Sequence, residues 1–147
     1  MKKFLSSVAL ALLATVAFAQ EEKNPNAPQI NFETEVIDYG TIEQNADGTR
    51  EFKFTNTGKE PLIITNCKGS CGCTVPSWPR EPIGPGESGV IKVKYATNRV
   101  GPINKSVTVN SNAATPVKVL RIKGRVKKVE PTKTVPTKEE KTSMMSK

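Results

Sequence analysis

Hydrophobic and polar residues alternate one by one along several short stretches of this sequence. The stretch 51–54 is Glu-Phe-Lys-Phe, 91–95 is Ile-Lys-Val-Lys-Tyr, and 106–109 is Ser-Val-Thr-Val. Successive side chains of a β-strand point to opposite faces, so this period of two predicts strands with one buried and one exposed face. Other stretches with apolar positions extend the pattern over the chain: 30–32, 36–42, 61–65 and 115–126.

Turn-forming residues separate these stretches. The clearest signals are Asp47-Gly48, Asn56-Thr57-Gly58, Gly84-Pro85-Gly86, Gly101-Pro102 and Asn110-Ser111-Asn112. Asp47-Gly48 is typical of a tight hairpin turn. About seven or eight short strands with regular turns and no helical periodicity predict an all-β fold, an antiparallel β-sandwich over 29–126. The open edges of such a sandwich can accept a partner strand.

The N-terminal residues have the composition of a secretory signal peptide. Two lysines follow the first methionine, 4–16 is mostly apolar, and 17–19 is Ala-Phe-Ala, the small-x-small pattern that precedes a cleavage site. A membrane-spanning helix needs about 20 apolar residues, so 4–16 is too short to cross a bilayer comfortably. We therefore expect cleavage after 1–19 and export to an oxidising periplasmic or extracellular compartment. We expect no transmembrane segment in the mature chain.

Both ends of the mature chain are polar. Residues 20–28 include two prolines, and 127–147 are rich in lysine, threonine, glutamate and proline. Segments with so little to bury are typical of disorder, so we predict a flexible leader over 20–28 and a basic disordered tail over 127–147. The formal net charge is +8. We attribute this dispersed excess to solubility, and export argues against nucleic acid as a partner.

The best-marked chemical feature is a cluster of the three cysteines, Cys67, Cys71 and Cys73, in a chain that has no histidine. Gly69 and Gly72 lie among them and allow the backbone to bend sharply. The cluster follows the apolar stretch 61–65, so it is expected on a loop after a strand.

Five motifs follow one another in the order found in a known family. They are Asp38-Tyr39-Gly40-Thr41-Ile42; Phe54-Thr55-Asn56-Thr57-Gly58 with Pro61-Leu62-Ile63-Ile64; Cys71-Gly72-Cys73-Thr74; Ile83-Gly84-Pro85-Gly86-Glu87; and Gly101 ahead of Val107-Thr108-Val109-Asn110-Ser111-Asn112. The chain thereby resembles the uncharacterised bacterial secreted domains with a Cys-Gly-Cys-Thr signature, related to the major-sperm-protein, PapD and Hydin type. The resemblance implies an immunoglobulin-like sandwich in an exported bacterial protein. It implies no particular activity, because fold alone does not supply one.

An oxidising compartment makes a disulfide our first hypothesis for the cysteines. We expect Cys67 to pair with Cys71 or with Cys73, which stabilises the loop by about 2 kcal/mol. Three cysteines cannot all pair within one chain, so one thiol is left free or pairs with a partner.

Two alternatives use the same three cysteines. As metal ligands, Cys67, Cys71 and Cys73 suit a soft ion such as copper(I), whereas structural zinc takes four ligands. As a redox site, Cys71 and Cys73 can cycle through a strained and easily reduced disulfide, with Lys68 helping to hold a thiolate. Met144 and Met145 are softer sulfur donors but lie in the predicted tail.

Catalytic constellations are missing from the sequence. Without histidine there is no histidine-dependent triad and no histidine-ligated metal. Trp78 is the one tryptophan, and we expect it to pack over one end of the sandwich beside the cysteine loop. We predict a non-enzymatic immunoglobulin-like domain that binds a protein or another envelope component. The loop 67–80, including Lys68 and Trp78, and an exposed sheet edge are its expected contact surfaces.

Overall fold

The chain forms strands throughout its described part. The structure is a computed structural model that describes residues 23–130, and no helix occurs in this range. The strands are β1 (Ile30–Phe32), β2 (Val36–Glu43), β3 (Thr49–Asn56), β4 (Ile64–Gly69), β5 (Thr74–Ser77), β6 (Ser88–Tyr95), β7 (Gly101–Ser111) and β8 (Val117–Lys127). The predicted signal peptide and most of the predicted tail lie outside the described residues.

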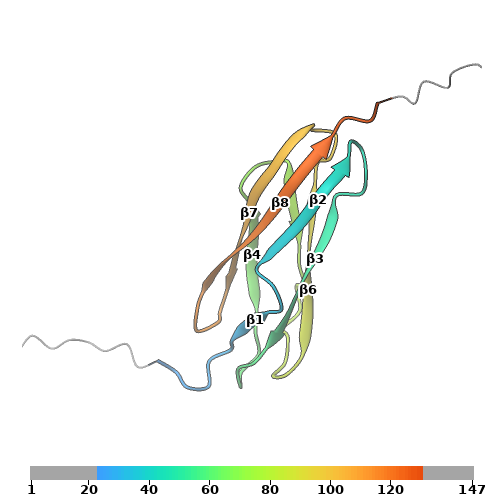
Figure 1. Ribbon diagram of the computed structural model, residues 1–147. Helices are drawn as coiled ribbons and strands as arrows, with labels where there is room; N and C mark the ends of the chain where they lie inside the picture. Colours follow the sequence, from blue (N-terminus) through green and yellow to red (C-terminus); the bar gives the residue numbers. More distant parts are fainter. Residues whose placement is uncertain (1–22, 131–147) are drawn as a thin grey trace, which may run out of the picture.

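The strands build two four-stranded sheets that face each other (Figure 1). The first sheet has the order β1-β3-β6-β5, and the second sheet has the order β2-β8-β7-β4. The sandwich is elongated, and the first and last described segments, blue and red in Figure 1, lie toward its opposite ends. This architecture confirms the predicted all-β, immunoglobulin-like sandwich of seven to eight strands.

One strand departs from the antiparallel arrangement. β2 pairs in parallel with β8, whereas the other strand pairs within 23–130 are antiparallel. The hairpin predicted at Asp47-Gly48 is therefore wrong, because β2 and β3 belong to different sheets. Gly48 is buried, and a Cβ there would overlap the carbonyl oxygen of Tyr95. The glycine is needed for this close backbone approach, not for a hairpin.

The inner faces of the two sheets share one hydrophobic core. Phe52 and Phe54 are 0% exposed, whereas Glu51 and Lys53 between them face solvent, as the alternation predicts. The other fully buried apolar side chains come from strands of both sheets and from the segment before β4: Leu62, Ile91, Val93, Ile103, Val107, Val109, Leu120, Ile122 and Val126. Each such side chain contributes about 1.5–3 kcal/mol relative to exposure, so the core is the main source of stability.

The end of the predicted leader is tied to the sandwich. The backbone N–H of Ala114 donates to the carbonyl of Pro28 at 2.8 Å, and that of Thr57 donates to the carbonyl of Gln29 at 2.9 Å. The fully buried Asn56 accepts a hydrogen bond from the backbone N–H of Gln29 at 3.2 Å. These bonds fix the path by which the chain enters β1.

Candidate functional site at the β4–β5 corner

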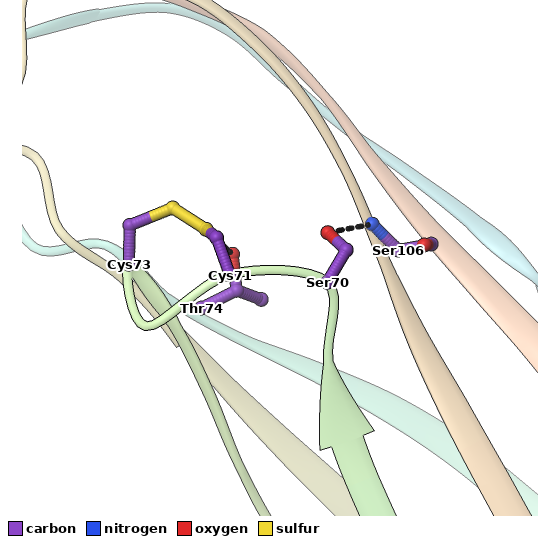
Figure 2. Close-up of a disulfide and its surroundings, with 5 residues drawn as sticks. All are labelled: Ser70, Cys71, Cys73, Thr74 and Ser106. Carbon is purple, nitrogen blue, oxygen red and sulfur yellow. Dashed lines mark hydrogen bonds between the residues drawn. A yellow bond between two sulfur atoms is a disulfide. The ribbon is translucent and has the colours of Figure 1, made fainter.

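The cysteine cluster lies where the chain crosses between the two sheets. β4 and β5 are edge strands of different sheets, and loop 70–73 joins them. The backbone N–H of Ser70 donates to the carbonyl of Ser106 at 2.8 Å, and the N–H of Ser106 donates to Ser70 Oγ at 3.1 Å (Figure 2). On the other side, the N–H of Ala96 donates to the carbonyl of Cys73 at 2.9 Å. Hydrogen bonds to Ser106 of β7 and to Ala96, directly after β6, therefore hold both ends of the loop in place. We call residues 67–80 the corner.

The two glycines of the corner have different surroundings. A Cβ built on Gly69 would overlap the backbone carbonyl oxygen of Thr74, so this position has no room for a side chain. A Cβ built on Gly72 would meet nothing within 4 Å. Gly69 thus lets the backbones of β4 and β5 approach closely, while Gly72 is at the open tip of the turn.

The disulfide joins Cys71 to Cys73, with their Cα atoms 5.2 Å apart. The predicted pairing of Cys67 with either of them is therefore wrong. The pair flanks a turn in which the N–H of Thr74 donates to the carbonyl of Cys71 at 3.1 Å, and this bend brings the two sulfurs together. Cys67 instead belongs to the regular part of β4, opposite Val109 of β7. The pair that the structure shows is the one named in the redox alternative.

Cys67 is the free thiol, and it faces the core. It is 6% exposed, and burial raises the pKa of its thiol to about 12, although the positive charge of Arg80 acts in the opposite direction. A thiol that stays protonated and covered is a poor nucleophile and a poor metal ligand. Within the corner, Cys67 therefore has the character of a core residue.

Thr74 has a buried hydroxyl directed at the disulfide. The residue is 2% exposed, and its Oγ1 lies 3.6 Å from Cys71 Sγ and 3.8 Å from Cys73 Sγ. Within 23–130, the two sulfurs are the only hydrogen-bond partners of this hydroxyl. Figure 2 shows the Thr74 side chain beside Cys71. Since a hydroxyl can rotate, it can donate to whichever sulfur becomes negatively charged.

Trp78 and Arg80 form a stacked pair after β5. The guanidinium carbon of Arg80 lies 3.9 Å from the centroid of the Trp78 ring, a cation–π contact. Trp78 packs against the core and is half-buried, as expected, and its buried Nε1 has no hydrogen-bond partner within 23–130. Lys68 is exposed and follows the buried Cys67 on β4. Successive strand residues point to opposite faces, so Lys68 points away from the Cys67 thiol.

The three cysteines do not form a metal-binding group in this arrangement. Two of them are bonded to each other, and a disulfide offers no thiolate to a metal. Within 23–130, no three cysteine, aspartate or glutamate side chains gather in a way that would hold an ion. Met144 and Met145 lie outside the described residues. Copper binding would require the disulfide to be reduced first.

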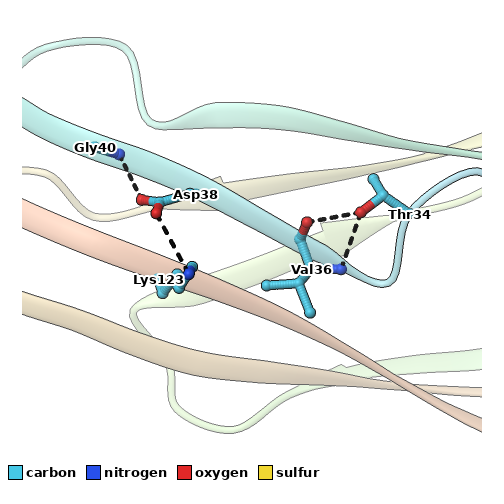
Figure 3. Close-up of polar contacts among 5 residues, drawn as sticks. All are labelled: Thr34, Val36, Asp38, Gly40 and Lys123. Carbon is cyan, nitrogen blue, oxygen red and sulfur yellow. Dashed lines mark hydrogen bonds and ion pairs between the residues drawn. The ribbon is translucent and has the colours of Figure 1, made fainter.

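The second predicted contact surface was an exposed sheet edge, and β2 is one of the edge strands. Its pairing with β8 shifts register between Asp38 and Thr41, and Gly40 there has a φ of 62°. Asp38 accepts a hydrogen bond from the N–H of Gly40 at 2.8 Å and lies 3.5 Å from the ammonium of Lys123 (Figure 3). The Gly40 hydrogen bond, with a smaller effect of Lys123, lowers the pKa of Asp38. Figure 3 also shows Thr34 bonded to Val36 at the start of the strand.

The predicted contact loop 67–80 includes Ser70, Thr74 and Arg80, but sequence reasoning gave none of them a role in the site. Thr74 was visible only as part of the Cys-Gly-Cys-Thr motif, and the motif does not say where a hydroxyl points. Ser70 acts through Ser106, which is far away in the sequence. The sequence did not distinguish Arg80 from other surface charges, because its stacking on Trp78 is a contact that only the folded structure shows.

The two facing four-stranded sheets are those of an immunoglobulin-like domain. The sequence model of the family described as "Protein of unknown function (DUF1573)" matches residues 30–126, and the chain belongs to this family. The match covers nearly the same range as the motifs that suggested such a family. A comparison with curated proteins finds no match.

Solved structures share the fold at low sequence identity. A protein of unknown function from Porphyromonas gingivalis W83 superposes with a TM-score of 0.60 at 15% identity, covering 69% of this chain and 48% of that chain. The PapD-like domain 7 of human CEP192 has a TM-score of 0.60 at 9% identity, covering 87% and 100%. The secreted serine protease VesC from Vibrio cholerae has a TM-score of 0.51 at 13% identity, covering 77% and 26%. The chain thus spans about half of the Porphyromonas protein, and these likenesses establish the PapD-like fold alone.

No helix within 23–130 is long and apolar enough to cross a membrane. The whole sequence lacks histidine, which excludes histidine-dependent triads and histidine-ligated metal centres.

Proposed function

We propose that this protein is an exported, non-enzymatic immunoglobulin-like domain that acts as a binding or structural module at the bacterial cell envelope. Its contact surface is the outer part of the corner, formed by Val75, Trp78 and Arg80. We call these three residues the corner surface. The partner is a protein, because extended protein segments and aromatic or guanidinium contacts are what an edge strand and a stacked Trp–Arg pair can bind.

The observation that carries the proposal is the combination of an open edge with large contact groups. β5 pairs with β6 on one side and has no second strand partner within 23–130. Val75 on this strand is 59% exposed, which is the largest exposed fraction of any large hydrophobic side chain within 23–130. Tryptophan and arginine are enriched at the centres of protein interfaces, and here Trp78 and Arg80 stack on each other directly after the end of β5.

A capture experiment with matched variants tests the binding surface. The chain without 1–19 is fixed to a resin, incubated with envelope extract, and the retained proteins are quantified by mass spectrometry. Val75→Lys and Arg80→Ala are expected to reduce retention of the partner by about tenfold or more, as for residues central to an interface. Val117→Lys is the control, because Val117 is 51% exposed on the other sheet.

Two outcomes would contradict the binding proposal. One is a wild-type chain that retains no protein above the level of the bare resin. The other is equal retention by Val75→Lys and Val117→Lys, which would place the contact elsewhere or show that capture is nonspecific.

The export part of the proposal rests on the residues of 1–19, which have the charged, apolar and small-residue segments of a signal peptide. Expression of the full chain in a bacterium should yield a periplasmic or secreted protein whose N-terminal sequence begins at Gln20. Ala19→Arg should slow the processing, because the peptidase requires a small residue there. Recovery of the unprocessed chain in the cytoplasm would refute export without bearing on the corner surface.

A further inference from the structure

We propose that the Cys71–Cys73 disulfide is a thiol–disulfide exchange site for small thiols and dithiols, in which Thr74 stabilises the departing sulfur. The inference goes beyond the binding function and does not require a protein partner. It rests on three features of the corner: unequal access to the two sulfurs, a buried hydroxyl whose partners are those sulfurs, and a loop that stays anchored when the bond opens.

Access favours attack on Cys71. Cys71 is half-buried, whereas Cys73 is 5% exposed and Cys67 is 6% exposed. Gly72 between the paired cysteines is exposed, and the space where its side chain would stand is open. A small thiolate can therefore approach Cys71 Sγ from the open tip of the turn, while the core covers the other two sulfurs.

The Thr74 hydroxyl is placed to assist the sulfur that leaves. A disulfide sulfur is a weak acceptor, so the contacts of 3.6 Å and 3.8 Å contribute little in the resting state. A thiolate is a charged acceptor, and hydrogen bonds to charged groups are roughly twice as strong as neutral ones. Burial of Cys73 opposes charge on its sulfur, so the neighbouring hydroxyl supplies stabilisation that solvent does not.

The reaction balances in two steps. The thiolate of an external dithiol attacks Cys71 Sγ, a bond forms between these sulfurs, and the Cys71–Cys73 bond breaks with its electron pair on Cys73 Sγ. Cys73 Sγ then takes a proton from water. The second thiolate of the dithiol attacks the external sulfur of the mixed disulfide and releases Cys71, which is also protonated. The protein disulfide is reduced by two electrons, and the dithiol is oxidised to its own disulfide.

The loop keeps its hydrogen bonds to neighbouring segments when the disulfide opens, and this favours re-formation of the disulfide. Ser70 remains bonded to Ser106, and Cys73 remains bonded to Ala96, because these hydrogen bonds use groups other than the sulfurs. Gly69 and Thr74 keep β4 and β5 in close contact. The two thiols therefore stay near each other after reduction, and such proximity favours renewed oxidation by an added disulfide.

The first experiment measures exchange in the folded protein. The chain without 1–19, carrying Cys67→Ala so that only the pair is counted, is treated with dithiothreitol in buffer without denaturant. Free thiols are alkylated and counted by mass, while Trp78 fluorescence monitors the fold. We expect two thiols to appear with the fold intact, and oxidised glutathione, added after the dithiothreitol is removed, to restore the disulfide. A pair that is reduced only when the protein unfolds would overturn the proposal.

Matched variants then test the hydroxyl. Thr74→Val keeps the shape and loses the hydroxyl, and it should slow reduction by about tenfold, whereas Thr74→Ser should stay near the wild-type rate. Equal rates for Thr74→Val and Thr74→Ser would overturn the role of the hydroxyl.

Mapping of the mixed disulfide keeps the proposal testable even where Thr74→Val does not fold. The Cys67→Ala chain with native Thr74 is treated with glutathione, quenched with acid and digested. We expect the adduct on Cys71. An adduct found on Cys73, or no adduct during reduction, would refute attack at Cys71.

Discussion

The β2 edge and the β4–β5 corner are both places where strand pairing ends, but they are constrained in different ways. At the β2 edge, Gly40 has a positive φ, a Cβ built on it would meet nothing within 4 Å, and the Asp38 carboxylate accepts its N–H. At the corner, Gly69 has no room for a side chain, and a disulfide closes the turn that follows. The local backbone conformation is what constrains Gly40, whereas steric packing is what constrains Gly69.

The difference has a consequence for partners. A register shift and charged side chains on an edge strand discourage the addition of another strand. β2 has both, since Asp38 and Glu43 form ion pairs with lysines of β8. β5 is short and has Pro76, which lacks an N–H, but it exposes Val75 and leads to the stacked Trp78. The β2 edge therefore disfavours pairing with another strand. The corner, in contrast, exposes an apolar side chain and holds the disulfide that we propose undergoes exchange.

The largest effect expected from this comparison is at Gly69. Gly69→Ala forces the Thr74 backbone away and should destabilise the protein by about 3 kcal/mol, the upper range for overpacking. Gly72→Ala, three positions on, should change the unfolding free energy by less than about 0.5 kcal/mol. Urea unfolding of both variants measures the difference. Equal effects would mean that packing does not constrain the corner.

A smaller effect is expected at the free thiol. Cys67→Ser places a hydroxyl in an apolar site, and it should cost about 1–3 kcal/mol if the hydroxyl finds no partner. Mass analysis of the same variant should still show the Cys71–Cys73 disulfide. Loss of that disulfide in Cys67→Ser would show that Cys67 takes part in the pairing.

At the β2 edge the corresponding substitution is Gly40→Ala. The left-handed conformation costs a residue with a Cβ about 1 kcal/mol, although the space around Gly40 is open. Gly40→Asn should cost less, because asparagine tolerates this conformation. Thermal unfolding should therefore rank wild type above Gly40→Asn and Gly40→Ala last. A loss at Gly40→Ala as large as at Gly69→Ala would remove the contrast between the two regions.

At neutral pH the smallest effect expected is the pH dependence from Cys67, which becomes large only as the pH rises above about 8.5. Burial raises the pKa of its thiol to about 12 in the folded chain, against about 8.5 in an unfolded one. The stabilisation is fully present below about pH 8.5 and is lost as the pH rises toward 12, because the unfolded chain releases its proton first. Between about pH 8 and about pH 10.5, wild type should lose more stability than Cys67→Ala, which has no thiol to titrate. Parallel losses would show that the thiol is not buried in solution.

The sandwich and the location of the site could be predicted, whereas the partners within the site could not. Alternation at Phe52 and Phe54 predicts their burial because the two-residue period is a local property of a strand. The cysteine positions predict a loop with thiol chemistry. The pairing of Cys71 with Cys73 depends on a turn that the sequence does not encode uniquely, since three cysteines allow several pairings.

By itself, the sequence determined that this chain is an all-β sandwich with Cys71 and Cys73 on a loop after a strand, because strand periodicity and turn residues are local signals. The immunoglobulin-like type came from the family resemblance of its motifs. Only the tertiary structure decided that β2 runs parallel to β8, that Cys67 faces the core, and that Thr74 Oγ1 lies beside both paired sulfurs. The first two depend on segments that are far apart in the sequence, whereas the third depends on the turn between Cys71 and Thr74. Which of the three sulfurs stays accessible therefore depends on the burial of each cysteine in the folded sandwich, and not on the local sequence pattern.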